Sequence, residues 1–187
     1  MESMEDSSQF IYELGMLRRI RREGWRLAGV EPESVAAHSL RAAQIGYLLA
    51  CMEGYARPDE VAAMLVFHDI GECRIGDIHK VANRYVTADE EAAVREQCSE
   101  LGSSGDRILA LWRCFETGDN DAGIIARDAD LLEMAATARE YMAAGHEAAG
   151  EWLDAIETRL STDSGRRIFK GLVTTEPQTW WQGLKQL

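Results

Sequence analysis

The sequence predicts an all-α fold, and three observations support that prediction. Apolar residues recur at spacings of three and four along most of the chain, which is the period of an amphipathic helix. The chain has only three prolines, and no long segment alternates β-branched with polar residues, as a half-buried strand would. The breaks in the helical pattern are short steps of Gly, Ser, Asp or Pro. We therefore expect a bundle of helices without a sheet.

Two helices are expected in the first part of the chain. The first covers residues 7–23 and ends near Gly24, because glycine disfavours a helix interior. The second begins at Ser34 and runs to about Gly54. Ser34 is the expected N-cap, since a serine hydroxyl accepts a hydrogen bond from a free amide of the first turn.

A third helix begins at Pro58, a residue favoured at the first helical position, and ends near Gly71. Residues 72–87 are expected to form an irregular loop that contains Gly76. The other expected helices, separated by short breaks, cover residues 88–101, 105–117, 121–144, 148–160, 164–172 and 176–185.

Size and composition predict one cytoplasmic domain that binds neither membranes nor nucleic-acid polymers. The 187 residues suffice to bury a core, and 46% of them are hydrophobic. The net charge of −12 disfavours a sequence-independent grip on nucleic acid. The four cysteines are spread without a CxxC pair, as in a reduced compartment. The segment MESMEDSSQF lacks the apolar part of a signal peptide, and no apolar run approaches the roughly 20 residues that span a bilayer.

Side chains with metal-binding chemistry fall on apolar helix faces. His68, for example, follows Met64 and Leu65 by four and three residues, so it continues the apolar stripe of the third expected helix. Four polar residues on three expected helices have apolar neighbours at such helical spacings, and these are His38, His68, Asp69 and Asp128. An ionised carboxylate that is buried without a partner costs several kcal/mol, so these aspartates need partners.

One divalent cation held by two imidazoles and two carboxylates satisfies all four groups. This donor set suits Mn, Co, Fe, Ni or Zn better than Ca. The alternatives are that a single buried histidine is a hydrogen-bonded core residue, and that a buried aspartate caps a helix or pairs with an arginine such as Arg127. The coincidence of four such groups on three helices favours the metal site.

Three segments resemble HD-domain phosphohydrolases. ESVAAHSLRAA is similar to the family's ESVxEHSxRxA segment, FHDIGECRIGDI to its HDxxExxxGDI segment, and RDADLLEM to the stretch around its last metal ligand. Together they resemble the 5′-deoxynucleotidase-like branch. The resemblance implies an all-helical HD domain over residues 1–187, with a motif-bearing core of about residues 10–145 and C-terminal helices over residues 146–187. It also implies a divalent metal and a homodimer.

Carried over by position, the resemblance makes His38, His68, Asp69 and Asp128 the metal ligands. Ala37 stands where the family has an acid before the first ligand, so this protein must orient the His38 imidazole in another way. Glu72 and Asp77 match acidic positions that help to activate water and contact the substrate. Glu72 is also one helical turn after His68, where it reaches a water activated by the metal as general base and then acid.

Those two acids have simpler interpretations. Glu72 is otherwise a solvated carboxylate at a helix end, and Asp77, after Gly76, is otherwise a turn residue that fixes the loop.

Cations are needed to bind an anionic substrate among so many carboxylates. The resemblance places Arg22 and Trp25 in the substrate pocket, and Arg18 lies one turn before Arg22. Lys80 and Arg84 are helical neighbours after the acidic loop and are expected to close over a phosphate; the alternative is a solvated basic patch. Trp25 is expected to stack on a base, although a tryptophan in this position is commonly part of a core.

The predicted function is metal-dependent removal of phosphate from nucleoside 5′-monophosphates, most specifically 2′-deoxynucleotides. The alternatives are hydrolysis of another phosphorylated metabolite or nucleotide messenger, and a non-catalytic HD module that senses a metal or nucleotide. Retention of Glu72 and Asp77 favours catalysis, because a binding module needs no acid that activates water.

Overall fold

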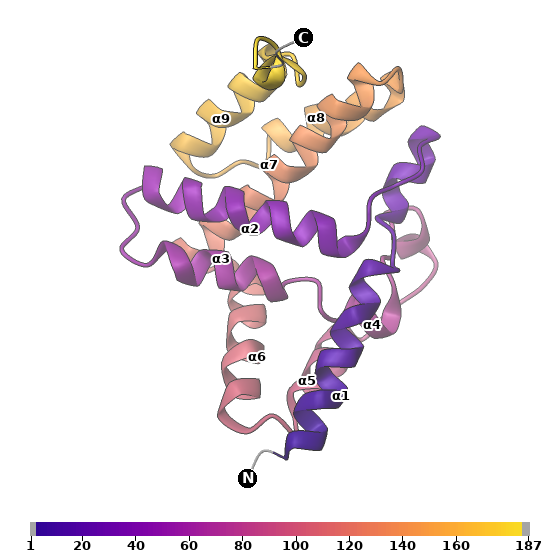
Figure 1. Cartoon of the computed structure of the whole chain (residues 1–187), viewed down its shortest axis with the longest axis vertical. Helices are drawn as coiled ribbons and strands as arrows, with labels where there is room; N and C mark the ends of the chain where they lie inside the picture. Colours follow the sequence, from indigo (N-terminus) through magenta and orange to yellow (C-terminus); the bar gives the residue numbers. More distant parts are fainter. Residues whose placement is uncertain (1–2, 185–187) are drawn as a thin grey trace.

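The computed structural model describes residues 3–184, and the fold is all-α (Figure 1). Within these residues no β-strand forms, and the single isolated β-bridge joins Arg21 to Ser34. The centre of the molecule consists of α2 (Val35–Met52), which packs most extensively against α3 (Pro58–Phe67) and α7 (Asp121–Ala143). The predicted helical fold is therefore confirmed.

The N-terminal helix is shorter than predicted. The segment forms α1 (Met4–Leu14), η1 (Gly15–Arg18) and η2 (Glu23–Ala28) in place of one helix over residues 7–23. Between the two 3-10 turns, the Arg22 N–H donates to the Glu33 carbonyl and the Val35 N–H to the Ile20 carbonyl, both at 3.0 Å. Because these bonds tie the segment to the start of α2, helical bonds cannot continue through it. Arg22 is thereby brought towards the middle of the molecule.

The start of α2 and its crossing with α3 follow local sequence signals. The Ser34 hydroxyl accepts a hydrogen bond from the Ala37 N–H at 3.2 Å, so the predicted N-cap is confirmed. Pro58 is the first residue of α3, also as predicted. Within α2, a Cβ atom on Gly46 would lie 2.3 Å from the Leu65 Cδ1 atom. Glycine at this position therefore permits the close approach of α2 and α3 that their shared core requires.

The segment after α3 is partly helical. Instead of a loop throughout residues 72–87, it contains α4 (Glu72–Ile75) and η3 (Ala82–Arg84). The Gly76 N–H closes the turn of α4 on the Glu72 carbonyl at 2.8 Å, and Gly76 then leaves the helix with a φ of 76°. The left-handed backbone that ends α4 is one that glycine adopts without a steric penalty.

The remaining helices agree with the prediction except at the C-terminal end. They are α5 (Glu90–Cys98), α6 (Gly102–Thr117), α7, η4 (Glu147–Gly150), α8 (Glu151–Glu157), α9 (Asp163–Thr174) and η5 (Thr179–Trp181). The helix predicted over residues 176–185 is reduced to the short turn η5, and residue 185 lies outside the described residues. Thr175 has an extended backbone and Pro177 lacks an amide donor, so α9 does not continue into this segment.

Three apolar clusters hold these helices together. The largest lies between α2, α3, α6, α7 and α9, and it includes Leu49, Leu65 and Leu132, all fully buried. A second includes Leu17 of η1 and Trp112 of α6, and a third includes Trp25, Ala138 and Ala149. Among the described residues, no helix combines the length and apolar character that crossing a membrane requires. A cluster of polar side chains lies where α2, α3 and α7 meet.

Candidate active site

Four polar side chains converge at the meeting point of α2, α3 and α7. The Nε2 atom of His38 lies 3.3 Å from the Nε2 atom of His68. The Asp130 Oδ1 atom is 3.1 Å from the His38 Nε2 atom. The Asp69 Oδ2 atom is 3.2 Å from the His68 Nε2 atom and 3.6 Å from that of His38. Two imidazoles and two carboxylates therefore aim one atom each at a common point.

The other nitrogen of each ring fixes its tautomer. The His68 Nδ1–H donates to the Leu65 carbonyl at 2.8 Å, and the His38 Nδ1–H donates to the Glu133 carboxylate. Neutral rings held in this way present Nε2 lone pairs, which face the two carboxylates. Four acceptors without a proton repel one another, so this arrangement requires a positive charge at its centre. The donor set thus fits a divalent cation, which two imidazoles and two carboxylates bind well.

The electrostatics of the cluster show the same requirement. Burial lowers the pKa of His38, but its hydrogen bonds with Asp130 and Glu133 outweigh burial and raise that pKa to about 10. Burial raises the pKa of Asp130, yet the hydrogen bond from His38 and the charges of both histidines hold it well below its usual range. A proton is therefore stabilised where the four acceptors meet, and a metal ion would occupy the same position.

Asp128, the last of the predicted metal ligands, does not lie in the cluster. The buried Asp128 carboxylate accepts hydrogen bonds from the Ser161 N–H at 2.9 Å, the Thr162 N–H at 2.7 Å and the Thr162 hydroxyl at 2.8 Å. It secures the chain before α9, but the N-cap of that helix is Thr162, so Asp128 is a buried hydrogen-bond acceptor and not itself a helix cap. Asp130, two residues later, faces the histidines, because residues two apart on a helix point about 200° apart. The structure thus brings Asp130, and not Asp128, into the cluster.

Asp130 was missed because its helix face is not apolar. One turn after it comes Glu133, which is fully buried and holds His38. Two acids spaced by three residues in the RDADLLEM segment were the available signal. The test for apolar neighbours selected Asp128, whose following residues Leu131 and Leu132 are in the core.

Glu133 also answers the question that Ala37 raised. Ala37 is exposed, so the position before His38 points away from the cluster. The Arg41 guanidinium donates to the Glu133 carboxylate from Nη2 at 2.7 Å and from Nε at 2.9 Å. Burial raises the pKa of Glu133, but the hydrogen bonds from His38 and Arg41 lower it on balance. An ionised Glu133 on α7 therefore orients the imidazole without an acid at position 37.

Arg22 connects the cluster to the two predicted catalytic acids. Its Nη1 atom lies 3.5 Å from the Asp69 Oδ2 atom, 3.9 Å from Glu72 Oε1 and 3.9 Å from Asp77 Oδ2. Burial and the charge of Asp69 raise the pKa of Glu72 to about 9, although Arg22 opposes the shift. The Glu72 Oε2 atom is buried without a hydrogen-bond partner among the described residues. Glu72 is therefore a carboxyl group that can exchange a proton and has a free oxygen to do so.

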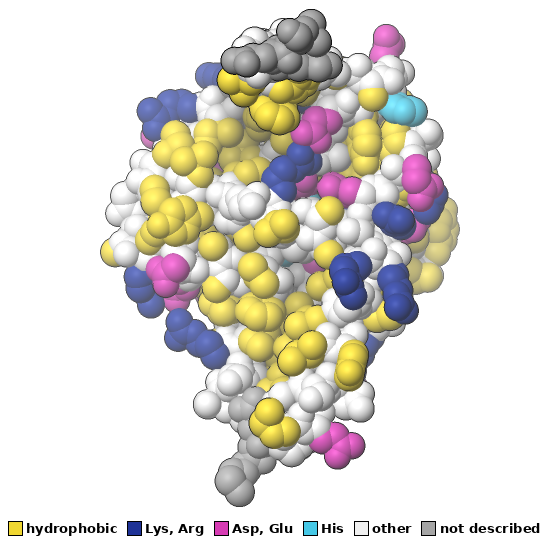
Figure 2. Space-filling model, in the orientation of Figure 1, with side chains coloured by type: hydrophobic (Ala, Val, Ile, Leu, Met, Phe, Trp, Pro, Cys, Tyr) yellow, Lys and Arg dark blue, Asp and Glu magenta, His cyan; other side chains and the backbone are white. Residues whose placement is uncertain are grey.

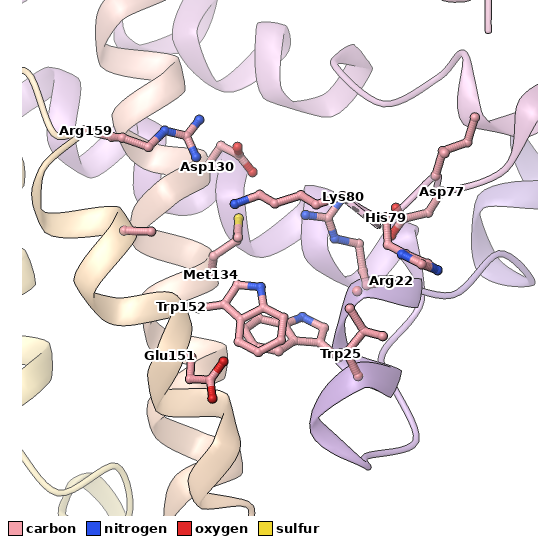
Figure 3. A pocket seen from close by; sticks show the side chains of 14 residues that line it. Arg22, Trp25, Asp77, His79, Lys80, Asp130, Met134, Glu151, Trp152 and Arg159 are labelled. Carbon is pink, nitrogen blue, oxygen red and sulfur yellow. Dashed lines mark ion pairs between the residues drawn. The ribbon is translucent and has the colours of Figure 1, made fainter. Parts of the chain in front are cut away.

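A cavity of about 360 Å³ opens beside these residues (Figure 3). Of the predicted substrate-binding residues, Arg22, Trp25 and Lys80 line it, whereas Arg18 and Arg84 do not. Trp25 is only 3% exposed and packs on Trp152 with ring centroids 5.0 Å apart, so the core alternative for Trp25 holds in part. The rest of the lining includes residues that no sequence motif indicated, among them His79, Met134, Trp152 and Arg159.

Two imidazoles and two carboxylates beside a cation-lined cavity, in an all-α scaffold, define the site of a metal-assisted hydrolase. Residues 14–170 match the model of the HD domain family. The chain therefore belongs to the HD-domain family, and it is a phosphohydrolase of that family. Membership in a hydrolase family sets aside the non-catalytic alternative.

Similar proteins agree with this family. The chain is 27% identical to the 5′-deoxynucleotidase HDDC2 of Danio rerio over 146 residues, which are 74% of this chain and 70% of that protein. It is 30% identical to the 5′-deoxynucleotidase HDDC2 of Bos taurus over 138 residues, which are 71% of this chain and 66% of that protein. The solved structure of the genomics protein APC5600 has a TM-score of 0.82 and 35% identity, covering 95% of this chain and 99% of its own.

Proposed function

We propose that this protein removes the phosphate from 2′-deoxynucleoside 5′-monophosphates. The main observation is the cavity beside the histidine–aspartate cluster, which combines stacked tryptophans with cations. A nucleotide needs both features, because its base stacks on aromatic rings and its phosphate needs positive charge. The similar HDDC2 proteins, which are named 5′-deoxynucleotidases, support the same substrate class.

We propose His38, His68, Asp69 and Asp130 as the ligands of one divalent metal ion. The Nε2 atoms of the two histidines lie 3.1 to 3.9 Å from the facing oxygens of the two aspartates, so a single ion placed between them would neutralise both carboxylates. Mn, Co, Fe, Ni and Zn all suit two nitrogen and two oxygen donors. When bound, such an ion supplies positive charge to phosphoryl oxygens and lowers the pKa of water.

Glu72 is the proposed general base and acid. Its free Oε2 atom can accept a proton from the attacking water and later return one to the leaving oxygen. Burial and the charge of Asp69 raise the pKa of Glu72, so the carboxylate binds a proton readily, and the positive charge of a bound metal ion would favour the ionised form that first accepts it. Arg22 contacts the Oε1 side, so it aims the carboxyl group without using the atom that moves the proton.

The remaining cavity residues are proposed to position the substrate. Lys80 makes no side-chain ion pair or hydrogen bond among the described residues, so its ammonium group can bind phosphate oxygens. Asp77 is held by Arg22 at the cavity wall and is placed to accept a hydrogen bond from a sugar hydroxyl. Trp152 is more exposed than Trp25 and offers the accessible ring for stacking.

A phosphate-release screen tests the proposal. Protein loaded with Mn²⁺ or Co²⁺ is assayed against deoxynucleotides, ribonucleotides and sugar phosphates, and the deoxynucleotides should be the best substrates. Glu72→Gln should lower kcat by about 10²- to 10⁴-fold, as loss of a general acid–base does, while keeping the metal. Glu100→Gln, at an exposed position, is the matched control. If only sugar phosphates released phosphate, a nucleotide would be rejected as the substrate.

We also propose a homodimer formed through α2 and α3. Large apolar side chains are exposed along these helices, among them Leu40, Tyr47 and Leu48 on α2 and Val66 on α3. Figure 2 shows apolar side chains gathered over this face. A contiguous apolar surface of this kind marks an interface. Sedimentation should show a dimer, and Leu48→Glu should make it monomeric.

The location of the protein in the cytoplasm stays a prediction from the sequence.

A further inference from the structure

A second cavity adjoins the tryptophan-lined cavity at Asp130. Its volume is about 370 Å³, and its walls come from the end of α6, the first turns of α7 and the segment between α8 and α9. Asp130 and Arg159 line both cavities. Phe115, which also lines the second cavity, contacts the His68 ring edge to face at a centroid distance of 4.8 Å. The second cavity therefore borders the histidine–aspartate cluster directly.

Two arginines provide the positive charge of this cavity. Arg159 makes no side-chain ion pair or hydrogen bond among the described residues, and in Figure 3 its guanidinium points towards Asp130. Arg127 donates one hydrogen bond, of 3.4 Å, to the Thr117 carbonyl. Its side chain crosses Gly118, where a Cβ atom would lie 2.6 Å from the Arg127 Nη1 atom. The absence of a side chain at Gly118 thus lets the guanidinium lie against the end of α6.

The acids of the second cavity do not neutralise these arginines. Asp128 already accepts hydrogen bonds from the Ser161 and Thr162 amides and the Thr162 hydroxyl. Asp130 is committed to the histidines. Burial raises the pKa of Glu116 on balance, although the nearby charge of Arg127 lowers it, and no ion pair within 4 Å joins Glu116 to Arg127. Two guanidinium groups consequently remain available to an anion.

We propose that this cavity is a phosphate-binding subsite, in which Arg127 and Arg159 bind a phosphate group beside the histidine–aspartate cluster. The subsite rests on the proposed function, since that reaction supplies phosphate at the shared Asp130. Guanidinium groups suit phosphate because their N–H groups donate in pairs to its oxygens. The phosphate group is either the inorganic phosphate that has just been released or the second phosphate of a nucleoside diphosphate.

Calorimetric titration of inorganic phosphate into Mn²⁺-loaded protein tests the subsite. Arg127→Gln should raise the Kd for phosphate about tenfold, the loss expected for one hydrogen bond between charged groups. Arg127→Lys should have a smaller effect, because it keeps the charge. Arg107→Gln is the matched control, since Arg107 is exposed and lines neither cavity. Circular dichroism and the Tm establish that each variant is folded.

A second set of titrations identifies the source of the phosphate group. If the subsite holds a distal phosphate, a deoxynucleoside diphosphate binds wild type more tightly than the monophosphate does, and Arg127→Gln removes the difference. If the subsite holds the released product, Arg127→Gln weakens the binding of inorganic phosphate, and the monophosphate and diphosphate bind equally well.

Two results would overturn the subsite. One is that Arg127→Gln and Arg159→Gln both bind inorganic phosphate and the diphosphate as wild type does. The other is that Lys80→Gln, in the first cavity, weakens the binding of inorganic phosphate while Arg127→Gln does not. Failure of the proposed function is distinguishable: wild type would hydrolyse no nucleotide, yet would still bind phosphate in a manner that depends on Arg127.

Discussion

His38 has no exposed surface, and both of its ring nitrogens are used. The Nε2 atom faces Asp130 and His68, and the Nδ1–H donates to Glu133. Glu133 is in turn held by Arg41, which also binds the exposed Glu140 carboxylate. This chain of contacts runs from solvent to the centre of the cluster. It fixes the orientation of the imidazole before any metal binds.

Glu133→Gln should weaken metal binding by about 10- to 100-fold, the usual effect of losing the partner of a ligating histidine. A glutamine keeps the shape but supplies no negative charge to the Nδ1–H group, so the imidazole becomes a poorer donor. Competition with a chromogenic chelator measures the affinity. Glu140→Gln, at the exposed end of the same contacts, is the control and should bind metal normally. Unchanged affinity in Glu133→Gln would remove Glu133 from the site.

Glu90 provides a pH-dependent test of the acidic surroundings of Asp69. Burial, and after it the charges of Asp69 and Glu116, raise the pKa of Glu90 to about 7. The folded-state pKa is above the unfolded value of 4.5, so ionisation of this group opposes folding. The free energy of unfolding should fall as the pH rises from about 4.5 to 7, and the full penalty should remain above that range.

The free energy of unfolding of Glu90→Gln should therefore exceed that of wild type by more at pH 8 than at pH 5. We expect this advantage to grow by about 2 kcal/mol, less than the full pKa shift implies, because the side chain is partly exposed. Urea unfolding with a chelator present, at both pH values, measures this difference. Glu91→Gln is the neighbouring control, because the exposed Glu91 is paired with Arg113 at 2.7 Å. Equal gains at both pH values would contradict the assigned pKa.

At the scale of elements, α7 has two functions on opposite faces. Asp128 faces α9 and holds the chain at Ser161 and Thr162. Asp130 faces α2 and α3 and joins the histidines. The same helix therefore docks the C-terminal part of the molecule and supplies a carboxylate to the site. Rotating α7 by half a turn would exchange the two residues and break both arrangements.

Substituting these two aspartates separates stability from metal binding. Asp128→Ala should lower the free energy of unfolding by about 2–3 kcal/mol, because it leaves buried amides without an acceptor, while the metal content stays normal. Asp130→Ala should lose the metal, which Asp128→Ala retains, and with it the activity. Urea unfolding in chelator and metal analysis by mass spectrometry measure both properties. The reverse pattern would restore Asp128 as the ligand.

At the scale of the whole molecule, the first cavity is assembled from distant parts of the chain. Arg22 and Trp25 come from the N-terminal part, Lys80 from the segment after α4, and Trp152 and Arg159 from α8 and the turn that follows it. The C-terminal helices, which carry no motif, thus form one wall of this cavity. Their packing on α7 determines the shape of that wall.

Trp152→Ala should raise KM for a deoxynucleotide by about tenfold and change kcat little, because stacking on a base contributes roughly 1–3 kcal/mol and is remote from the reacting phosphate. Steady-state kinetics with the metal-loaded enzyme provide both constants. Trp180→Ala, at an exposed position outside the first cavity, is the control. A fall in kcat at constant KM would show that Trp152 acts on the reacting groups instead.

The sequence by itself determined the all-α class, the start of α2 at Ser34, the start of α3 at Pro58 and the adjacent His68–Asp69 pair. These features depend on local periodicity and capping, which act within one or two helical turns. Only the tertiary structure decided between Asp128 and Asp130, placed Glu133 behind His38 and brought Trp152 to the cavity. Those outcomes depend on how α7 is rotated against α2 and α9, and contacts distant in the sequence set that rotation.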